Sequence, residues 1–461
     1  MRGRLVGVLT LLAFVLSLLL FWDFTVDDSY ISHRYAYNYL HHGVWNWDVA
    51  APRVEAYTSA LYAALAMIPI GLGWPVDVFF KVFHLGLGLG WWWSLRGYWR
   101  RYALLFLVSC WYIPIHVFSG LETWSFMLAL VWLAQMLDRP VSFWGWALVW
   151  VLPFIRPEGL FFALWGAYVY VRQSSGRQVL SVVLVLGLWL GYFVWRYDYF
   201  GYLLPNTFYF KAIQGSSIRY LPRHLLEVAF YALPLALLWR CSPRRFAHEG
   251  MLVIAFALGL LLYAPSSLQM NYADRFWIQL FVPLFWVYAT GLESQHKAWL
   301  IAASLFIWIG TNRNLDEWRR CSHYGAALEQ VHIKTGRALA PFADRGYMLL
   351  TGDAGALPYF SGWRSVEFVG VANPELTHRG WTDDYLDVLQ PDLVVLFSRT
   401  AHPSGIFSDH HQDRIWTWLQ DQNTHQYITH KTWRNGDTYL YFLRRDLPDF
   451  TAIAEALRLS P

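Results

Sequence analysis

Long apolar stretches alternate with short polar connections over the first two thirds of the chain. The first stretch runs from Leu5 to Trp22, which is long enough for a membrane-spanning helix of about 20 residues. No small-x-small cleavage site follows it, so it predicts an anchor rather than a cleaved signal peptide. Further apolar segments follow near residues 57–72, 76–93, 102–117, 121–137, 141–154, 159–171, 178–197, 222–239, 250–264, 276–291 and 297–311. The pattern predicts a polytopic α-helical membrane protein.

Basic residues predict the orientation of this bundle. Arg2 and Arg4 place the N-terminus in the cytoplasm, because cytoplasmic connections carry an excess of Lys and Arg. Three later connections are basic in the same way, at Arg96, Arg100 and Arg101, at Arg172 and Arg177, and at Arg240, Arg244 and Arg245. If residues 57–72 and 76–93 both crossed the membrane, Arg96 would lie outside. We therefore expect that one of these two segments does not cross fully, and that about 11 helices span the membrane.

The character of the chain changes after Gly310. The remainder holds 33 of the 68 charged residues and contains the strand-like runs YMLL, DLVVLF and TYLYFL between polar, turn-rich stretches. We expect residues 1–312 to form the transmembrane catalytic domain, with a long first periplasmic loop at 23–56. Residues 313–461 are expected to form a soluble periplasmic α/β domain.

Composition supports the membrane assignment and excludes several classes of function. Hydrophobic residues make up 56% of the chain and charged residues 15%, with 28 Trp and 28 Tyr, too apolar for an ordinary cytosolic enzyme. A net charge of +4 indicates no nucleic-acid partner, which would need a basic face. The three cysteines lie far apart and predict neither a disulfide framework nor a zinc site.

The candidate catalytic and binding residues are concentrated in the loops that are expected to face outward. Carboxylates can take a proton from an attacking hydroxyl, while Arg and Lys can hold a phosphate leaving group. A sugar carried on a lipid phosphate requires both, and no nucleotide-binding motif is present in a supporting context. The catalytic candidates are Asp27 and Asp28. The substrate-binding candidates are His33, Arg34, Glu55, Glu122, Arg156, Glu158, Asn206, Lys211, Arg275 and Asp353.

A set of ordered motifs carries a resemblance to a known family. The stretches DDSYISHRYAYNYLHHGVWNW, VEAYTSALY, SGLET, RPEG, GYLLPNTFYFK, NYADRFW and GDAGALPYFSG occur in this order over roughly residues 20–375. Together they resemble the polyprenyl-phosphate-dependent glycosyltransferases of the GT-C fold. Within that fold, the likeness is strongest to arabinofuranosyltransferases that act on mycobacterial glycans or on pseudomonad type IV pilins. The chain departs from the expected pattern at Ala56, where glycine is expected.

The resemblance implies a function and a location. It implies an enzyme of the bacterial inner membrane that works on the periplasmic face and inverts the anomeric carbon. The implied donor is decaprenyl-phosphate D-arabinofuranose or a close relative. The implied acceptor is a glycan or a pilin Ser or Thr. It also implies that Asp27 and Asp28 lie at the catalytic centre.

Several candidates have structural alternatives. Asp28 can cap the helix predicted for SYISHRYAYNYL, with Asp27 favourably placed at the helix dipole. Glu55 and Glu122 can simply be wet ends of membrane helices. An Asp-x-Gly turn explains Asp353 equally well as sugar binding does.

The candidate phosphate-binding cations and the possible metal site also have alternative interpretations. Arg156, Lys211 and Arg275 can extend toward lipid headgroups instead of binding substrate phosphate. The histidines His33, His41 and His42 lack the spacing of a three-ligand metal site. A divalent cation bound by carboxylates stays open.

Two other functions share many of these features. A secondary transporter also has many spans and buried charges, but it should show repeated halves, and none are evident. An oligosaccharyltransferase that moves a preassembled glycan needs the same donor phosphate and acceptor hydroxyl. The size of the transferred glycan distinguishes that case.

Overall fold

A computed structural model describes most of the chain. The described residues are 12, 14–95, 110, 112–174, 178–215, 217–243, 245–268, 270–292, 301–307, 315–402, 407, 410–433 and 436–460. Residues 5–11 and 13 of the predicted N-terminal anchor lie outside them, as do parts of the segments at 102–117 and 297–311. The predictions made for Arg96, Arg100, Arg101, Arg177, Arg244 and the boundary at Asn312 also lie outside.

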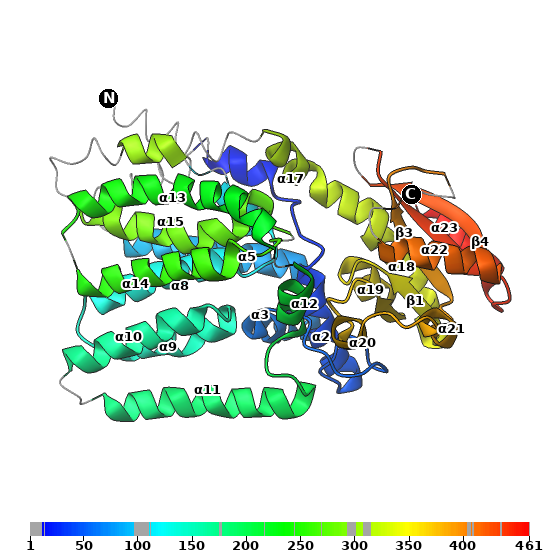
Figure 1. The fold of residues 1–461 in the computed structure, drawn as a ribbon, viewed down its shortest axis with the longest axis horizontal. Coiled ribbons are helices and arrows are strands. Elements are labelled where there is room, and N and C mark those ends of the chain that lie inside the picture. The colour runs from blue at the N-terminus through cyan, green and yellow to red at the C-terminus, as the bar shows by residue number, and fades with distance from the viewer. Residues whose placement is uncertain are drawn as a thin grey trace.

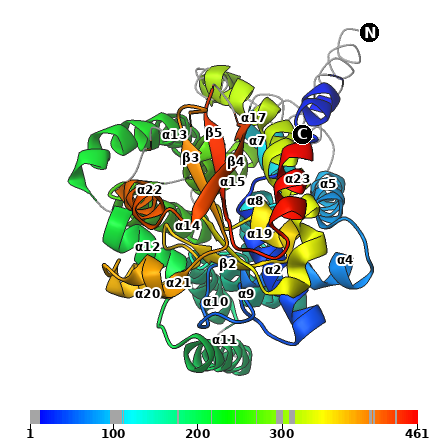
Figure 2. The same ribbon diagram turned by 90° about the vertical axis from the view of Figure 1, so that its right-hand side faces the viewer.

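The first two thirds of the chain fold into a layer of helices. The described helices there are α2 (Ser29–His42), α3 (Ala60–Leu65), α4 (Met67–Gly71), α5 (Val76–Ser94), α7 (Tyr112–Phe118), α8 (Thr123–Leu137), α9 (Phe143–Ile155), α10 (Gly159–Gln173), α11 (Val179–Phe200), α12 (Asn206–Gly215), η1 (Ile218–Tyr220), α13 (Leu221–Cys241), α14 (Phe246–Ala257), η2 (Leu258–Tyr263), η3 (Tyr272–Asp274) and α15 (Arg275–Thr290). Helices α8 to α11 and α13 to α15 lie side by side along one direction (Figures 1 and 2). Local signals bound them: Ser142 caps α9 by accepting the amide of Gly145, and α11 ends at the left-handed Gly201.

Several of these helices have the length and composition of membrane spans. By length and composition alone, three described helical stretches qualify, at Val179–Phe200, Ile218–Cys241 and Phe246–Tyr263. Two bent pairs raise this number to five if each pair is one span. In the first, the stretch Ala60–Gly71 is bent by 118° from Val76–Ser94, which is the geometry of a broken span or of a re-entrant loop. The total of eleven crossings stays a prediction.

The last third of the chain is built around a mixed sheet. Its elements are α17 (Leu315–Leu328), η5 (Glu329–Ile333), α18 (Lys334–Leu339), η6 (Ala340–Arg345), β1 (Met348–Thr351), α19 (Ala356–Ser361), β2 (Arg364–Glu367), α20 (Pro374–Arg379), α21 (Tyr385–Leu389), β3 (Leu393–Ser398), α22 (His410–Gln422), β4 (His425–Thr432), β5 (Thr438–Arg444) and α23 (Phe450–Leu459). The strand order is β2-β1-β3-β5-β4. Strand β1 pairs in parallel with β2 and β3, and β5 pairs antiparallel with β3 and β4. The strands predicted from YMLL, DLVVLF and TYLYFL are thereby confirmed as β1, β3 and β5.

The sheet is covered on both faces because its strands alternate apolar side chains between two cores. Leu349, Val395 and Tyr441 point to one face, where they pack with α18 and α23. Leu350 and Val394 point to the other, where α21 and α22 cover them. The sheet therefore forms the middle of a three-layer unit, seen at the right of Figure 1.

The first loop and α2 lie between the helical layer and the sheet unit. Two glycines allow the chain to approach closely there. A Cβ added at Gly325 of α17 would lie 1.7 Å from the carbonyl oxygen of Asp23, and one at Gly355 would lie 2.1 Å from that of Asp27. Any larger residue would push the first loop away from the sheet unit.

Candidate functional site

A cavity lies where the helical layer meets the sheet unit. Its volume is about 110 Å³. The segments that line it come from seven parts of the chain. Six of them include the motifs DDSY, VEAYTS, SGLET, RPEG, PNTFYFK and NYADRFW, and the seventh is a loop of the sheet unit. The lining residues are Asp28, Ile31, Ser32, Ala56, Tyr57, Thr58, Ser59, Leu121, Glu122, Arg156, Thr207, Phe210, Lys211, Met270, Arg275, Phe276 and Val371. Segments far apart in sequence thus bring carboxylates and cations to one place.

Asp28 is the acid of the first loop that faces this cavity. It precedes α2, but its side chain makes no capping hydrogen bond to that helix, so the capping alternative does not describe its role. Burial raises the pKa of Asp28, while the charges of Arg275 and Lys211 oppose that rise. A carboxylate in this setting is a stronger proton acceptor than one in water.

Asp27 has different surroundings. Its carboxylate accepts a hydrogen bond of 2.7 Å from the amide of Ala356, the first residue of α19, and its own amide lies 3.2 Å from the hydroxyl of Tyr324. Burial raises the pKa of Asp27 well above its ordinary value, and the Asp353 carboxylate raises it further. Asp27 therefore ties the first loop to the start of α19 and is absent from the cavity lining.

A buried network of charges forms one wall of the cavity. Arg275 donates to Glu122 over 2.9 Å, and Arg156 forms an ion pair with the same carboxylate. Arg156 also binds Glu158 over 2.8 Å, and Glu158 in turn accepts from Tyr263. Burying so many charges is favourable only when each finds partners, and this network supplies them.

Lys211 is the cation of the cavity without such a partner. No hydrogen bond or ion pair joins its ammonium group to any residue that the structure describes, and its nitrogen lies 5.2 Å from the ring centre of Phe276. Burial, together with the charges of Arg275 and Arg156, lowers the pKa of Lys211 to about 8. The Nε atom of Arg275 is also buried and unpaired within the described residues. These two groups can receive an anion.

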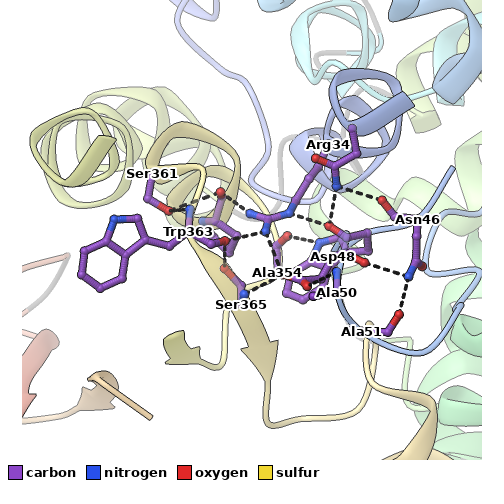
Figure 3. A network of polar contacts seen from close by, with 12 residues as sticks. Arg34, Asn46, Asp48, Ala50, Ala51, Ala354, Ser361, Trp363 and Ser365 are labelled. Carbon is purple, nitrogen blue, oxygen red and sulfur yellow. Dashed lines mark hydrogen bonds and ion pairs between the residues drawn. The ribbon is translucent and has the colours of Figure 1, made fainter. Parts of the chain in front are cut away.

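His33 and Arg34 lie on α2 but outside the cavity lining. His33 stacks on Phe80 with the ring centres 5.2 Å apart, and burial lowers its pKa to about 3. Arg34 donates to the carbonyls of Trp47 over 2.6 Å and of Trp363 over 2.7 Å, and it contacts Asp48 over 3.4 Å (Figure 3). Arg34 thus joins the first loop to the sheet unit.

The remaining candidates occupy the rim of the site. Glu55 pairs with Arg196 of α11 over 2.5 Å, and burial raises the pKa of Glu55 to about 7. Asn206 donates to the carbonyl oxygens of Gly370 and Val371. Asp353 lies 4.0 Å from His332 and keeps about a third of its side chain exposed. None of these three side chains lines the cavity.

A metal site in a protein is usually built from several grouped His, Cys, Asp or Glu side chains. Within the described ranges, no group of three or more His, Cys, Asp or Glu side chains is arranged to hold a metal ion. Glu122, one of the two acids in the cavity lining, is instead paired with Arg156 and Arg275.

Some lining residues were missed by sequence reasoning. Thr58, Ser59 and Thr207 lie inside quoted motifs but were not singled out, because hydroxyl residues are common at helix starts. Val371 comes from a loop of the sheet unit with no distinguishing pattern. Only its position in the fold reveals that it reaches the cavity.

Comparisons with known proteins place the fold. A family model described as a domain of unknown function (DUF8728) matches residues 318–443. No curated protein matches this chain. Two crystal structures of ArnT from Cupriavidus metallidurans, one bound to undecaprenyl phosphate and one in the apo state, are similar to it at a TM-score of 0.55 and 12% identity. They cover 95% and 96% of this chain, respectively, and each is covered over 98% of its own length. At this identity the likeness speaks for the fold alone, and the predicted GT-C fold of a multi-pass membrane protein is confirmed.

Proposed function

We propose that this chain is an inverting glycosyltransferase that uses a polyprenyl-phosphate sugar as donor. The observation that carries the proposal is that Asp28, Lys211 and Arg275 line one cavity. Within the part of the chain that the structure describes, the ammonium group of Lys211 has no ion pair and the Nε atom of Arg275 has no hydrogen-bond partner. A proton acceptor next to an anion site is what a phosphate-linked sugar requires. The undecaprenyl phosphate in one of the ArnT structures supports a lipid phosphate of this class.

Asp28 is the proposed general base. It takes the proton of the acceptor hydroxyl as that oxygen forms a bond to the anomeric carbon of the sugar. The acceptor oxygen approaches from the face of the sugar opposite the phosphate. The bond between the anomeric carbon and the phosphate oxygen breaks, and its electron pair stays on the phosphate. This sequence of events inverts the anomeric configuration.

Lys211 and Arg275 are the proposed phosphate ligands. Both stabilise the negative charge that grows on the leaving phosphate, Arg275 through directed N–H groups and Lys211 as a point charge. Arg156 lines the same cavity but is committed to Glu122 and Glu158, so we assign it to positioning the wall.

The assignments of the sugar, the acceptor and the cellular location rest on the resemblance that the ordered motifs carry. They favour D-arabinofuranose as the sugar and a periplasmic glycan or pilin hydroxyl as the acceptor. They also favour the bacterial inner membrane, with the cavity and residues 313–461 on the periplasmic side. We keep these assignments as part of the proposal.

Purified chain incubated with a panel of polyprenyl-phosphate pentoses and hexoses tests the proposal directly. We expect release of polyprenyl phosphate from one member of the panel, fastest with decaprenyl-phosphoryl-D-arabinofuranose. Mass spectrometry of the acceptor should show the addition of one sugar. Transfer only from a polyprenyl-linked oligosaccharide added to the panel would instead support en bloc transfer, and release from no member would contradict the proposal.

A further inference from the structure

We propose that Val371, in the loop of residues 367–373 of the sheet unit, lies against the transferred sugar and limits the size of that sugar. This inference rests on the proposed function. It assigns a role to a loop that is far in sequence from the helical layer and that is included in the match to residues 318–443.

The cavity lining has two chemically different parts. One part is charged and comes from the helical layer, with Lys211, Arg275, Arg156 and Glu122. We assign the donor phosphate to this part of the lining, because Lys211 and Arg275 can donate charge-assisted hydrogen bonds to it.

The other part of the lining is neutral. It combines the small side chains of Ala56 and Val371 with the hydroxyl groups of Thr58 and Thr207. Neutral hydroxyl groups can exchange hydrogen bonds with the hydroxyls of a sugar ring. Since Lys211 and Arg275 are the proposed phosphate ligands, we assign the sugar to this neutral part of the lining.

The loop that carries Val371 is held firmly from its own side. The carboxylate of Glu367, which is fully buried, accepts the amides of Val369 over 2.5 Å, Gly370 over 2.9 Å and Ala372 over 3.0 Å. Gly370 has a φ of +117°, which favours glycine. A loop with three amides bound to one carboxylate presents Val371 in a defined position.

Helix α12 fixes the same loop from the helical side. Its first residue, Asn206, donates to the carbonyl oxygens of Gly370 over 2.7 Å and Val371 over 2.9 Å. Lys211 lies five residues further along the same helix. One short helix therefore sets the distance between Lys211, the proposed phosphate ligand, and Val371.

The test compares lipids with and without a sugar. Binding of undecaprenyl phosphate, decaprenyl-phosphoryl-D-arabinofuranose and a polyprenyl-phosphoryl mannose would be measured on the purified full chain. Val371→Trp should weaken binding of both glycosylated lipids at least tenfold relative to wild type, and change that of undecaprenyl phosphate less than twofold. Val371→Ala should raise the affinity for the hexose lipid relative to the pentose lipid at least threefold. Val388→Trp, at an exposed position of α21, is the matched control and should behave as wild type.

The outcomes separate the two proposals. If wild type fails to bind undecaprenyl phosphate, the proposed function itself is contradicted. If wild type binds all three lipids and Val371→Trp binds the glycosylated ones equally well, the inference is overturned while the proposed function stands. If Val371→Trp does not fold, Val371→Ala decides, and an unchanged ratio of hexose to pentose affinity overturns the inference.

Discussion

Asp27 and Asp28 are adjacent in sequence, yet the fold gives them different partners. The carboxylate of Asp27 is occupied by the amide of Ala356, whereas that of Asp28 faces the cavity that Lys211 and Arg275 also line. A general base must be free to reach the hydroxyl that it deprotonates. At the scale of single residues, this difference separates a positioning acid from the proposed base.

Substituting each acid by Asn tests that separation. Asp28→Asn should lower turnover by about 10² to 10⁴, the usual range for a lost acid or base, because an amide cannot take the proton. Asp27→Asn keeps an oxygen that can accept the Ala356 amide, so it should keep turnover within about tenfold of wild type. Initial rates of donor consumption and melting temperatures in detergent measure both effects. Full activity of Asp28→Asn would move the base elsewhere, with Glu55 and Glu122 as the next candidates.

Replacing Arg275 removes an ion-pair partner of Glu122, whereas replacing Lys211 does not. Lys211→Met and Arg275→Met should each weaken lipid-phosphate binding by about tenfold or more, because a hydrogen bond to a charged group contributes about 1.5–3 kcal/mol. Arg275→Met should also lower the melting temperature, since Glu122 loses a partner, whereas Lys211→Met should not. Titration with undecaprenyl phosphate and a thermal melt give both quantities. Wild-type affinity in both variants would mean that neither cation binds the phosphate.

The pKa of Lys211 predicts a pH dependence of donor binding. A phosphodiester carries one negative charge throughout the neutral and alkaline range, so only the protein titrates. Because the pKa of Lys211 is lowered to about 8, its positive charge is present below pH 8 and is lost as the pH rises through that value. The KM for the donor should therefore rise between pH 7 and pH 9. Lys211→Arg should flatten this rise, because a guanidinium group stays protonated. An equally steep rise in Lys211→Arg would assign the titration to another group.

At the scale of elements, α2 connects the helical layer to the sheet unit. Its Arg34 reaches backbone carbonyls of the first loop and of the segment that follows α19, and Asp48 completes the connection by accepting the amide of Ser365 over 2.7 Å. These contacts lie beside Asp27 and its bond to α19. The placement of the proposed base thus depends on how these elements dock.

Removing the Arg34 guanidinium tests that dependence. Arg34→Met should destabilise the chain by about 3–5 kcal/mol, because Asp48 and several buried carbonyls lose their charged partner. Thermal or denaturant unfolding measures this loss. The matched control is Arg414→Met, which removes a more exposed ion pair to Asp383 and should change stability by at most about 1 kcal/mol. Equal stability of the two variants would show that Arg34 does not hold the elements together.

At the scale of the whole molecule, the two ends of the helical layer differ in chemistry. The end beside the sheet unit carries the cavity (Figure 1). The opposite ends of the helices carry exposed basic residues, with Arg172 in the last turn of α10, Arg240 in the last turn of α13 and Arg245 before α14. This asymmetry agrees with a cytoplasmic basic end, which would place the cavity and the sheet unit outside.

Cysteine labelling in intact cells measures this orientation. Single cysteines would be placed at Gln173, at the basic end, and at Val388, which is 78% exposed on the sheet unit. A background with Cys241→Ser is suitable, because Cys110 and Cys321 are buried. An impermeant maleimide should label Val388→Cys only. Labelling of Gln173→Cys alone would reverse the orientation and contradict a periplasmic site.

The sequence by itself determined the parts of this protein that depend on local pattern. Long apolar segments predicted the helical layer, and short continuous apolar runs predicted β1, β3 and β5. An element that is buried in the core carries apolar side chains on its buried faces. The strands β2 and β4 were missed, since both lie at sheet edges where polar residues such as Arg364 and Gln426 are tolerated. The ordered motifs predicted the GT-C fold and named Asp28, Glu122, Arg156, Lys211 and Arg275, all of which line one cavity.

Only the tertiary structure decided how neighbouring candidates divide their roles. The amide that occupies Asp27 belongs to a residue 329 positions away, and Val371 reaches the cavity from the sheet unit. The same long-range packing directs His33 and Arg34 away from the cavity and into contacts with Phe80 and Trp363. Patterns within a segment specify which face of a helix is buried, but which partner meets that face depends on how distant segments pack together.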